Sequence, residues 1–434
     1  MLNAVLPGLA RLGRPFRLLL ASDVLMLLSM MVGQVVLPWR IAHLGGARHL
    51  AIYVATLAAV SFFALPLLSP LGDRHSKRAL MTVGLAAMLV ESLLQAGMAQ
   101  AEFYRIEWII SLGVIQTVAR AVIMPVSFSI VAELLPSEHL NEGLGYQRSA
   151  QAVGRLLGPV VAGAILAAAG TATALWVNAA FLWVACLLAW RIVVPPRDAS
   201  QRSTAQWVHD LQAGLAAKWK IPTERGWTFV SFLVMIFFVP GIGMLVPLKV
   251  QSLGLSGAWL GACEAGLSVG MLLGSLGGSS WLAGRVGRFR ASTGAIFGEG
   301  LSLALLGFTH QPWLMVAALT VVGGCIATVQ TVGHTHRMLA MPQDFRARMT
   351  AVNMMVMQVA GILGPGLAGM GLAAFDVDQV YIAFGAGLFL VGLGYRRVPG
   401  YRRFLDMPHD EAAGFYGREH PALFGAKPAA SVGP

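Results

Sequence analysis

Apolar residues are gathered into long blocks, separated by short polar segments rich in charged residues, Gly and Pro. A block of about 20 apolar residues, at 1.5 Å of helical rise per residue, crosses the hydrocarbon layer of a bilayer. The pattern therefore predicts twelve transmembrane helices. They are expected at Phe16–Ile41, Ala51–Leu71, Ala79–Ala99, Trp108–Val131, Ala150–Ala169, Leu175–Val194, Trp227–Lys249, Ala258–Leu282, Ser292–Phe308, Trp313–His334, Thr350–Phe375 and Tyr381–Leu393.

The blocks are apolar all round, whereas the strands of a membrane barrel are short and alternate polar with apolar residues. Of 434 residues, 56% are hydrophobic and 12% charged, an apolar excess that a water-soluble core cannot bury. The basic N-terminal stretch could be read as a secretory signal. The apolar run behind it is too long and lacks a typical cleavage site, so it is expected to be the first span. The fold class predicted is all-α integral membrane, with twelve spans.

The formal net charge of +11 would also be typical of a nucleic-acid-binding protein. The positions of the charged residues along the chain distinguish that class from a membrane protein. Most Lys and Arg residues fall on one side if the N-terminus is inside. Arg40, Arg48, Arg105 and Lys249 fall on the other side, and Arg120 and Arg155 fall within the layer. The positive-inside rule explains this asymmetry without nucleic acid. We expect a bacterial-type cytoplasmic (inner) membrane protein, with both termini cytoplasmic.

A polar stretch after the sixth block divides the chain into six plus six spans. The expected divisions are an N-terminal six-helix bundle at 1–194, a cytoplasmic linker at 195–226 with an amphipathic helix near Thr204–Trp219, a C-terminal bundle at 227–398 and a cytoplasmic tail at 399–434. The halves repeat one another. Gly158-Pro159 in the fifth block matches Gly364-Pro365 in the eleventh at an offset of 206, and Pro136 matches Pro342 at the same offset. Duplicated halves are typical of transporters.

The segment after the second block reads Ser69-Pro70-Leu71-Gly72-Asp73-Arg74-His75-Ser76-Lys77-Arg78. It resembles the loop 2–3 signature of the major facilitator superfamily, G-x3-D-[RK]-x-G-[RK]-[RK], with serine at both glycine positions. The resemblance covers nearly the whole chain. It implies that Asp73, Arg74, Lys77 and Arg78 form a cytoplasmic gate, with Asp73 as a charge–dipole latch between the halves. A carboxylate near a helix N-terminus favours such a latch, although a loop that is merely positive-inside would read similarly.

The fifth block matches the family's antiporter signature, G-x8-G-x3-G-P-x2-G-G. Its positions here are Gly145, Gly154, Gly158, Pro159, Ala162 and Gly163. Positions 154, 158 and 162 lie on one helical stripe, which lets a neighbouring helix approach closely, and Pro159 removes one backbone hydrogen bond. In the family this motif accompanies antiport and export, whereas ordinary small-residue packing is the alternative.

Within the family, Glu133-Leu134-Leu135-Pro136 and Arg155-Leu156-Leu157-Gly158-Pro159 are similar to exporters of the macrolide-efflux and enterobactin-export type. The resemblance implies a monomer that exports a siderophore or an amphipathic drug-like compound by alternating access, with proton antiport as driving force and no cofactor. A proton-coupled nutrient or metabolite importer is the alternative. A channel explains the duplicated halves less well. An enzyme is not expected. The segment Gly266-Leu267-Ser268-Val269-Gly270 matches the sequence pattern of a nucleophile elbow, but it lies inside a span and lacks the strand-to-helix context of that motif.

Ionisable residues within the layer are functional candidates, because each costs several kcal/mol to bury there. They are Asp23, Glu91, Arg120, Glu264 and Glu299. In the family fold, spans 1, 4, 7 and 10 line the cavity. That favours Asp23 and Arg120 for proton coupling or substrate binding, with Glu264 as a further candidate. Glu91 and Glu299 lie at comparable depths of equivalent spans and are secondary candidates.

Uncharged residues add weaker candidates. Gln34, Gln330, Asn353 and Gln358 could hydrogen-bond a substrate, with Met and Trp providing adaptable apolar surface. Cys186, Cys263 and Cys325 each lie in a span and are expected to be packing residues, so no disulfide or metal site is predicted. The expected partners are a small-molecule substrate and the lipid bilayer.

Overall fold

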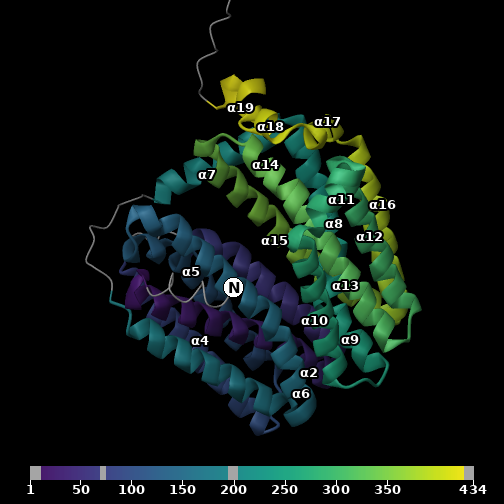
Figure 1. Cartoon of the computed structure of the whole chain (residues 1–434). Helices are drawn as coiled ribbons and strands as arrows, with labels where there is room; N and C mark the ends of the chain where they lie inside the picture. The colour runs from purple at the N-terminus through teal and green to yellow at the C-terminus, as the bar shows by residue number, and fades with distance from the viewer. Residues whose placement is uncertain (1–10, 69–74, 194–203, 425–434) are drawn as a thin grey trace, which may run out of the picture. The chain divides into compact units, whose positions relative to one another are not determined.

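The computed structural model describes residues 11–68, 75–193 and 204–424. The regular structure in this part of the chain is helical throughout. The chain folds into two compact units. Unit 1 comprises Met1–Ser203 and Val246–Ala265, and unit 2 comprises Thr204–Leu245 and Gly266–Pro434. Figure 1 shows their helices in chain order.

Unit 1 is built mainly from α2 (Gly13–Leu68), α4 (Lys77–Gln100), α5 (Ile106–Leu134) and α6 (Leu140–Trp190). Two of these helices are far too long for one span. The 56 residues of α2 would reach about 80 Å if straight. Each is in fact two helices joined at a glycine, Gly46 (φ 68°, ψ −172°) in α2 and Gly170 (φ 78°, ψ −179°) in α6. Only glycine adopts this conformation readily. These four helices therefore contribute six spans.

The other six spans follow from Pro222 onward. Their helices are α8 (Pro222–Gly243), α9 (Leu245–Ser252), α10 (Gly257–Leu273), α11 (Ser279–Val286), α12 (Arg288–Phe308), α13 (Pro312–Thr328), α14 (Thr335–Ala340), α15 (Gln343–Ala374) and α16 (Val377–Gly392). Helix α9 continues α8 after a break at Met244. Two π-helical turns, Gly274–Gly278 and Val329–His334, join α10 to α11 and α13 to α14.

Within the described residues, ten helices are long and apolar enough to cross a membrane, and α2 and α6 each count twice. The prediction of twelve spans in an all-α membrane fold is therefore confirmed. The glycine that turns α2 at residue 46 has a counterpart in Gly254 (φ 66°), which lies between α9 and α10 in the seventh-to-eighth connection. The duplication seen in the sequence thus extends to the backbone.

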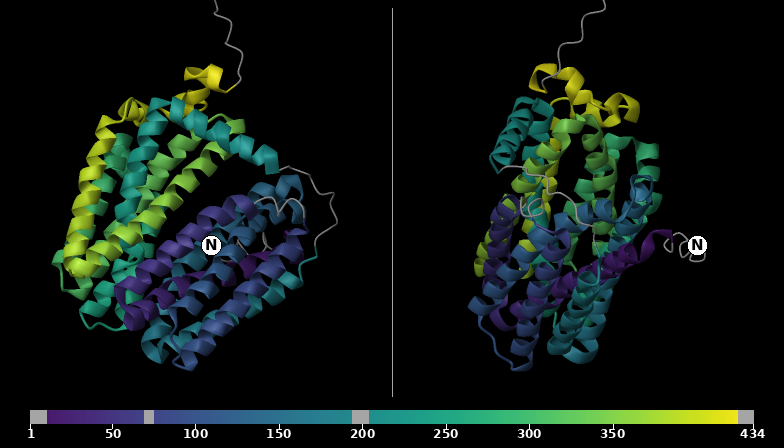
Figure 2. Two further views of the ribbon diagram at one scale, coloured as in Figure 1. Left: turned by 180° about the vertical axis from the view of Figure 1, so that it is seen from behind. Right: turned by 90° about the vertical axis from the view of Figure 1, so that its left-hand side faces the viewer.

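Segments outside the apolar blocks also fold onto unit 2. Helix α7 (Thr204–Lys220) packs along α15 and α8. The last described residues form α17 (Tyr401–Asp406), α18 (His409–Ala412) and α19 (Phe415–Glu419), which lie across one end of the unit 2 helices in Figure 2. The Gly414 N–H donates to the Leu339 carbonyl at 2.9 Å, and the Phe289 N–H donates to Asp406 Oδ1 at 3.1 Å. The segment that follows the last span is therefore a packed cap.

Candidate functional site

A buried carboxylate with uncharged partners lies in unit 1. Asp23 is fully buried in the first span, and its oxygens accept hydrogen bonds from two side chains. Ser127 Oγ lies 2.8 and 2.9 Å from the two carboxylate oxygens, and Gln147 Nε2 lies 2.7 Å from Oδ2. Ser127 and Gln147 are themselves fully buried. We call Asp23, Ser127 and Gln147 the Asp23 cluster.

Three helices position the Asp23 cluster. Asp23 lies on α2, Ser127 on α5 and Gln147 near the start of α6. The Gln147 amide also donates to the Ser127 carbonyl at 2.9 Å, which fixes the amide between the two helices. Its own oxygen, Oε1, has no hydrogen-bond partner among the described residues. The cluster therefore retains one unused acceptor directly beside the carboxylate.

The antiporter signature lies next to this cluster, on α6. A Cβ on Gly154 would come within 2.8 Å of Leu27 Cβ, and one on Gly158 within 2.3 Å of Met31 Cβ. These contacts are shorter than side chains tolerate, so the stripe needs glycine wherever α6 presses against α2. Gly163 meets Gly261 Cα in the same way, at 2.2 Å from its hypothetical Cβ. The signature therefore sets the spacing of the helices that carry Asp23 and Gln147.

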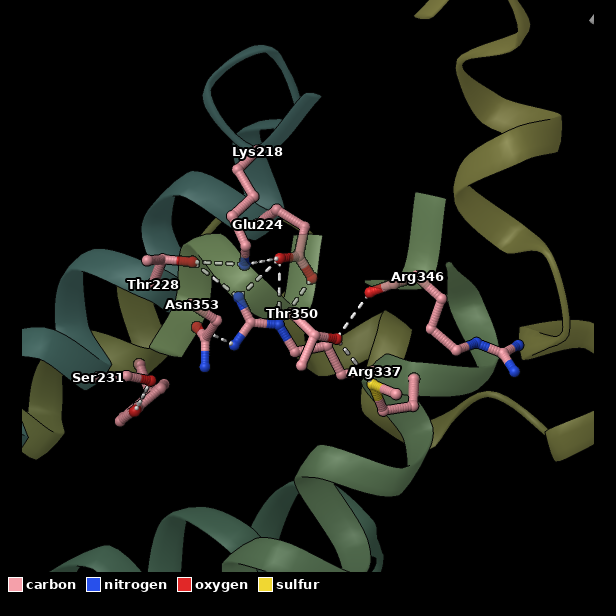
Figure 3. Close-up of polar contacts among 10 residues, drawn as sticks. Lys218, Glu224, Thr228, Ser231, Arg337, Arg346, Thr350 and Asn353 are labelled. Atoms are coloured by element: carbon pink, nitrogen blue, oxygen red, sulfur yellow. Dashed lines mark hydrogen bonds and ion pairs between the residues drawn. The ribbon is translucent and has the colours of Figure 1, made fainter. Parts of the chain in front are cut away.

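Unit 2 contains a second buried carboxylate, surrounded by charge. Glu224 near the start of α8 is fully buried and binds Arg337 of α14 through both oxygens, with Nε at 2.9 and 3.1 Å and Nη2 at 2.6 Å. Lys218 of α7 lies 3.0 Å from Glu224 Oε2. Arg337 also donates to Thr228 Oγ1 at 2.7 Å and to Asn353 Oδ1 at 3.1 Å. We call these five residues the Glu224 cluster (Figure 3).

The Glu224 cluster brings two cations to one carboxylate. The side chains of Lys218 and Arg337 are each only 4% exposed. Burial, together with the nearby Arg337 guanidinium, lowers the pKa of Lys218 to about 8 even though Glu224 favours its charged form. Arg337 also stacks its guanidinium carbon 4.7 Å from the Trp227 ring. Arg337 is thus the permanent cation of the cluster, and Lys218 is the cation that loses its proton more readily than a lysine in water.

The structure gives only part of the predicted gate motif. Asp73 and Arg74 lie outside the described residues. Lys77 Nζ forms an ion pair with Glu133 at 2.7 Å, and Arg78 donates to the Trp190 carbonyl at 2.6 Å. Ser76 accepts from the Ala79 N–H and so caps α4. These contacts anchor the start of α4 to α5 and α6 within unit 1.

Of the other predicted polar residues, Asn353 lies in the Glu224 cluster, whereas Arg120, Gln34, Gln330, Gln358 and Glu264 belong to neither cluster. Arg120 is exposed on α5 and has no ion pair or hydrogen bond within the described part of the chain. Arg120 and Asp23, the two favoured candidates, therefore do not form an ion pair with each other. Gln34 and Gln330 are exposed, and Gln358 is half-buried. Glu264 is half-buried on α10, in unit 1.

The two secondary candidates are buried in different bundles. Glu91 is 1% and Glu299 is 5% exposed. Neither forms an ion pair with another described residue, and Glu91 Oε1 has no hydrogen-bond partner among those residues. No group of three or more metal-ligating side chains occurs in the described ranges.

Sequence reasoning named Asp23 and Asn353 and missed the other six residues of the two clusters, Ser127, Gln147, Lys218, Glu224, Thr228 and Arg337. Ser127 and Gln147 are polar residues inside apolar helices. Glu224 and Arg337 lie just beyond the apolar blocks, because α8 begins at Pro222 and α14 continues to Ala340. One signal was present in the sequence. Gln147 and Asn353 stand 206 positions apart, the same offset that relates Gly158 to Gly364.

Comparisons with known proteins agree with this architecture. The family model described as Major Facilitator Superfamily matches residues 19–298 and 279–406. The chain belongs to the major facilitator superfamily. The nucleoside transporter NupG has the same fold, with a TM-score of 0.71 over 89% of this chain and 99% of that one at 14% identity.

Two curated relatives match a smaller part of this chain than NupG does. The multidrug efflux pump Tap of Mycolicibacterium fortuitum is 24% identical over 243 residues, which are 56% of this chain and 59% of the relative. Tap of Mycobacterium tuberculosis (strain ATCC 25618 / H37Rv) is 24% identical over 254 residues, 58% of this chain and 60% of the relative. The matched segments thus span about three-fifths of those proteins' length.

Proposed function

We propose that this protein exports a small amphipathic molecule, drug-like or siderophore-like, by alternating access, and that proton entry at Asp23 drives the export. Its membership of the superfamily and the name of the Tap relatives support an efflux role. The antiporter signature, whose glycines press α6 onto the Asp23 helix, supports exchange.

The single observation that carries the coupling role is the chemistry of the Asp23 cluster. Neither Ser127 nor Gln147 is charged, so protonation of Asp23 breaks no ion pair within the cluster. A serine hydroxyl can donate to a carboxylate or accept from a carboxylic acid. A protonated Asp23 can therefore donate to Ser127 Oγ, while Gln147 Nε2 keeps its hydrogen bond to the Ser127 carbonyl. The cluster therefore accommodates either protonation state at small cost.

Glu224 is the less suitable proton carrier. Its two cationic neighbours stabilise the ionised form, and a proton added there would leave two buried cations without a counter-charge. We therefore assign coupling to unit 1 and a structural role to the Glu224 cluster.

The test uses inside-out membrane vesicles with an imposed proton gradient. Ethidium serves as the amphipathic probe and a catecholate siderophore as the second. Wild type should accumulate at least one probe, and a protonophore should abolish the accumulation. Asp23→Asn should lose gradient-driven accumulation but retain downhill exchange, because the amide fills the same space without titrating.

Glu107→Gln is the matched control, because it neutralises an exposed carboxylate outside the cluster. It should accumulate the probe as wild type does. Accumulation by Asp23→Asn at the wild-type level would overturn the coupling assignment. Accumulation that ignores the protonophore would overturn proton coupling altogether.

A further inference from the structure

A groove of about 500 Å³ runs along one side of unit 2. The π-helical turn Gly274–Gly278, between α10 and α11, forms one wall, and α12 and α13 form the others. At its narrow points the helices meet backbone to backbone, since a Cβ on Gly270 would lie 1.9 Å from the Thr320 carbonyl oxygen. At Gly294 the groove is open, and a Cβ there would meet no atom within 4 Å.

The groove presents hydrocarbon along most of its length. Its hydroxyl groups are already used within the protein. Ser279 and Thr328 share a hydrogen bond of 3.0 Å, Thr328 also donates to the Gly324 carbonyl at 2.9 Å, and Thr320 donates to the Val316 carbonyl at 2.8 Å. The remaining lining side chains are almost all apolar, with Leu273 and Val321 more than half exposed. A ligand in the groove must therefore be apolar over most of its length.

One end of the groove carries a charged side chain. Arg290 is part of the lining, on the first turn of α12, where the span leaves its apolar segment. It is exposed and forms no ion pair or hydrogen bond with the residues that the structure describes. Arg285, at the end of α11, lies over the Trp281 ring with 4.4 Å between guanidinium carbon and ring centroid. Exposed Trp and Arg at the end of a span are typical of the headgroup level of a membrane.

We infer that this groove is a binding site for an anionic phospholipid, with an acyl chain against the glycine wall and the phosphate on Arg290. An available cation at the end of an apolar groove suits a ligand with one anionic head and a long hydrocarbon tail. Basic pockets between membrane helices are known to select such headgroups. Guanidinium also binds phosphate through two parallel hydrogen bonds, which adds specificity.

Lipid is favoured over a transported molecule as occupant because the site combines exposed apolar surface with a cation at headgroup level, where phospholipid is always available. Lipid binding in this groove is independent of the direction, substrate and coupling of transport. Its test measures lipid binding alone and needs no transport assay.

The purified full chain is titrated with phosphatidylglycerol or phosphatidylcholine in detergent, and retained lipid is counted by native mass spectrometry. Wild type should retain one phosphatidylglycerol in preference to phosphatidylcholine. Arg290→Gln should weaken that retention roughly fivefold, the factor that one interfacial cation supplies. Gly294→Leu should abolish it, because Gly294 lines the groove, a Cβ there meets no atom within 4 Å, and the larger side chain would fill space that the acyl chain needs.

Two control variants distinguish the groove from general effects. Gly97→Leu adds a leucine at another helical glycine with no atom within 4 Å, and Arg148→Gln removes an exposed arginine from α6. Both should bind phosphatidylglycerol as wild type does. Equal retention of the two lipids by wild type would overturn the anionic assignment. Undiminished binding in Gly294→Leu would overturn the location.

Discussion

Each unit buries a carboxylate on the first helix of its half, and the groups around the two carboxylates differ. In each unit the carboxylate lies on the first helix of a half, Asp23 in unit 1 and Glu224 in unit 2, and accepts hydrogen bonds from a fourth-helix side chain, Ser127 or Arg337. A fifth-helix amide belongs to each cluster at the repeat offset of 206, but Gln147 donates to the carboxylate itself whereas Asn353 accepts from Arg337. The matched amides therefore lie in a polar cluster in both units, although Asp23 and Glu224 stand 201 positions apart and are not matched at the repeat offset.

The close helix packing beside the clusters is also shared. Gly158 on the fifth span presses against the first span, and a Cβ there would lie 2.3 Å from Met31 Cβ. Gly364 on the eleventh span presses against the seventh, where a Cβ would lie 2.5 Å from the Ile236 carbonyl oxygen. Since packing is shared, the charges around the carboxylate are the main difference. Neutral partners leave Asp23 free to change charge, whereas two cations hold Glu224 ionised.

The largest expected effect is on the stability of unit 2. Glu224→Gln leaves Arg337 and Lys218 buried without a counter-charge, and breaking a buried ion pair typically costs about 3–5 kcal/mol. Asp23→Asn replaces hydrogen bonds between the carboxylate and uncharged groups with amide hydrogen bonds, so its cost should be about 1 kcal/mol. Thermal unfolding of the detergent-solubilised variants, followed by tryptophan fluorescence, measures both.

A double variant keeps this prediction testable when Glu224→Gln yields little protein. Glu224→Gln with Arg337→Gln removes the bidentate partner together with the carboxylate and should be more stable than Glu224→Gln alone, because the two residues are directly coupled. If Glu224→Gln unfolds at the temperature of Asp23→Asn, the ion pair does not hold the cluster together and the contrast between the units fails.

The sequence was sufficient to predict the spans, because twelve apolar blocks of membrane length leave little choice of secondary structure. The turns inside α2 and α6 could also be placed, since each lies where one block ends and the next begins. Asp23 was found for the same reason, as a carboxylate inside an apolar block is conspicuous.

The Glu224 cluster could not be found in this way. Glu224, Lys218 and Arg337 lie outside the apolar blocks, where charged residues are common and hydropathy carries no information. Their burial depends on tertiary packing, because α7 and the cap formed by α17, α18 and α19 cover the end of unit 2. Tyr401, Phe404 and Tyr416 in that cap are each at most 2% exposed. Only the match of Gln147 to Asn353 hinted at a second site.

A smaller effect should appear in the pH dependence of stability. The pKa of Lys218 is lowered from 10.5 to about 8 by burial and by Arg337. The unfolded chain therefore binds more protons than the folded chain between about pH 8 and 10.5, so folding becomes more favourable as pH rises through this window. At about 1.36 kcal/mol per pKa unit, the gain is about 3 kcal/mol at most.

Lys218→Met isolates this contribution, since methionine fills similar space without a charge. The unfolding temperature of wild type relative to Lys218→Met should rise between pH 8 and pH 10 and stay constant below pH 8. Lys220→Met, which removes an exposed lysine from the same helix, is the control and should show no such trend. A difference between wild type and Lys218→Met that stays constant across the whole range would show that Lys218 does not titrate in the cluster.

The smallest effect concerns the two matched amides. Gln147 donates to the Asp23 carboxylate at 2.7 Å, and Asn353 accepts from Arg337 at 3.1 Å. A hydrogen bond to a charged group contributes about 1.5–3 kcal/mol, yet the two losses should differ. Among the described residues, Asp23 keeps Ser127 as its other side-chain partner, whereas Arg337 keeps both Glu224 and Thr228. Gln147→Leu should therefore lower the unfolding temperature more than Asn353→Leu. The double variant Asp23→Asn with Gln147→Leu should be less destabilised than the sum of the single variants, because the two residues share one contact. Equal losses for the two leucine variants would mean that the amides serve only as packing residues. The different charges of the two clusters would then have no effect on the hydrogen bonds of the fifth-helix amides.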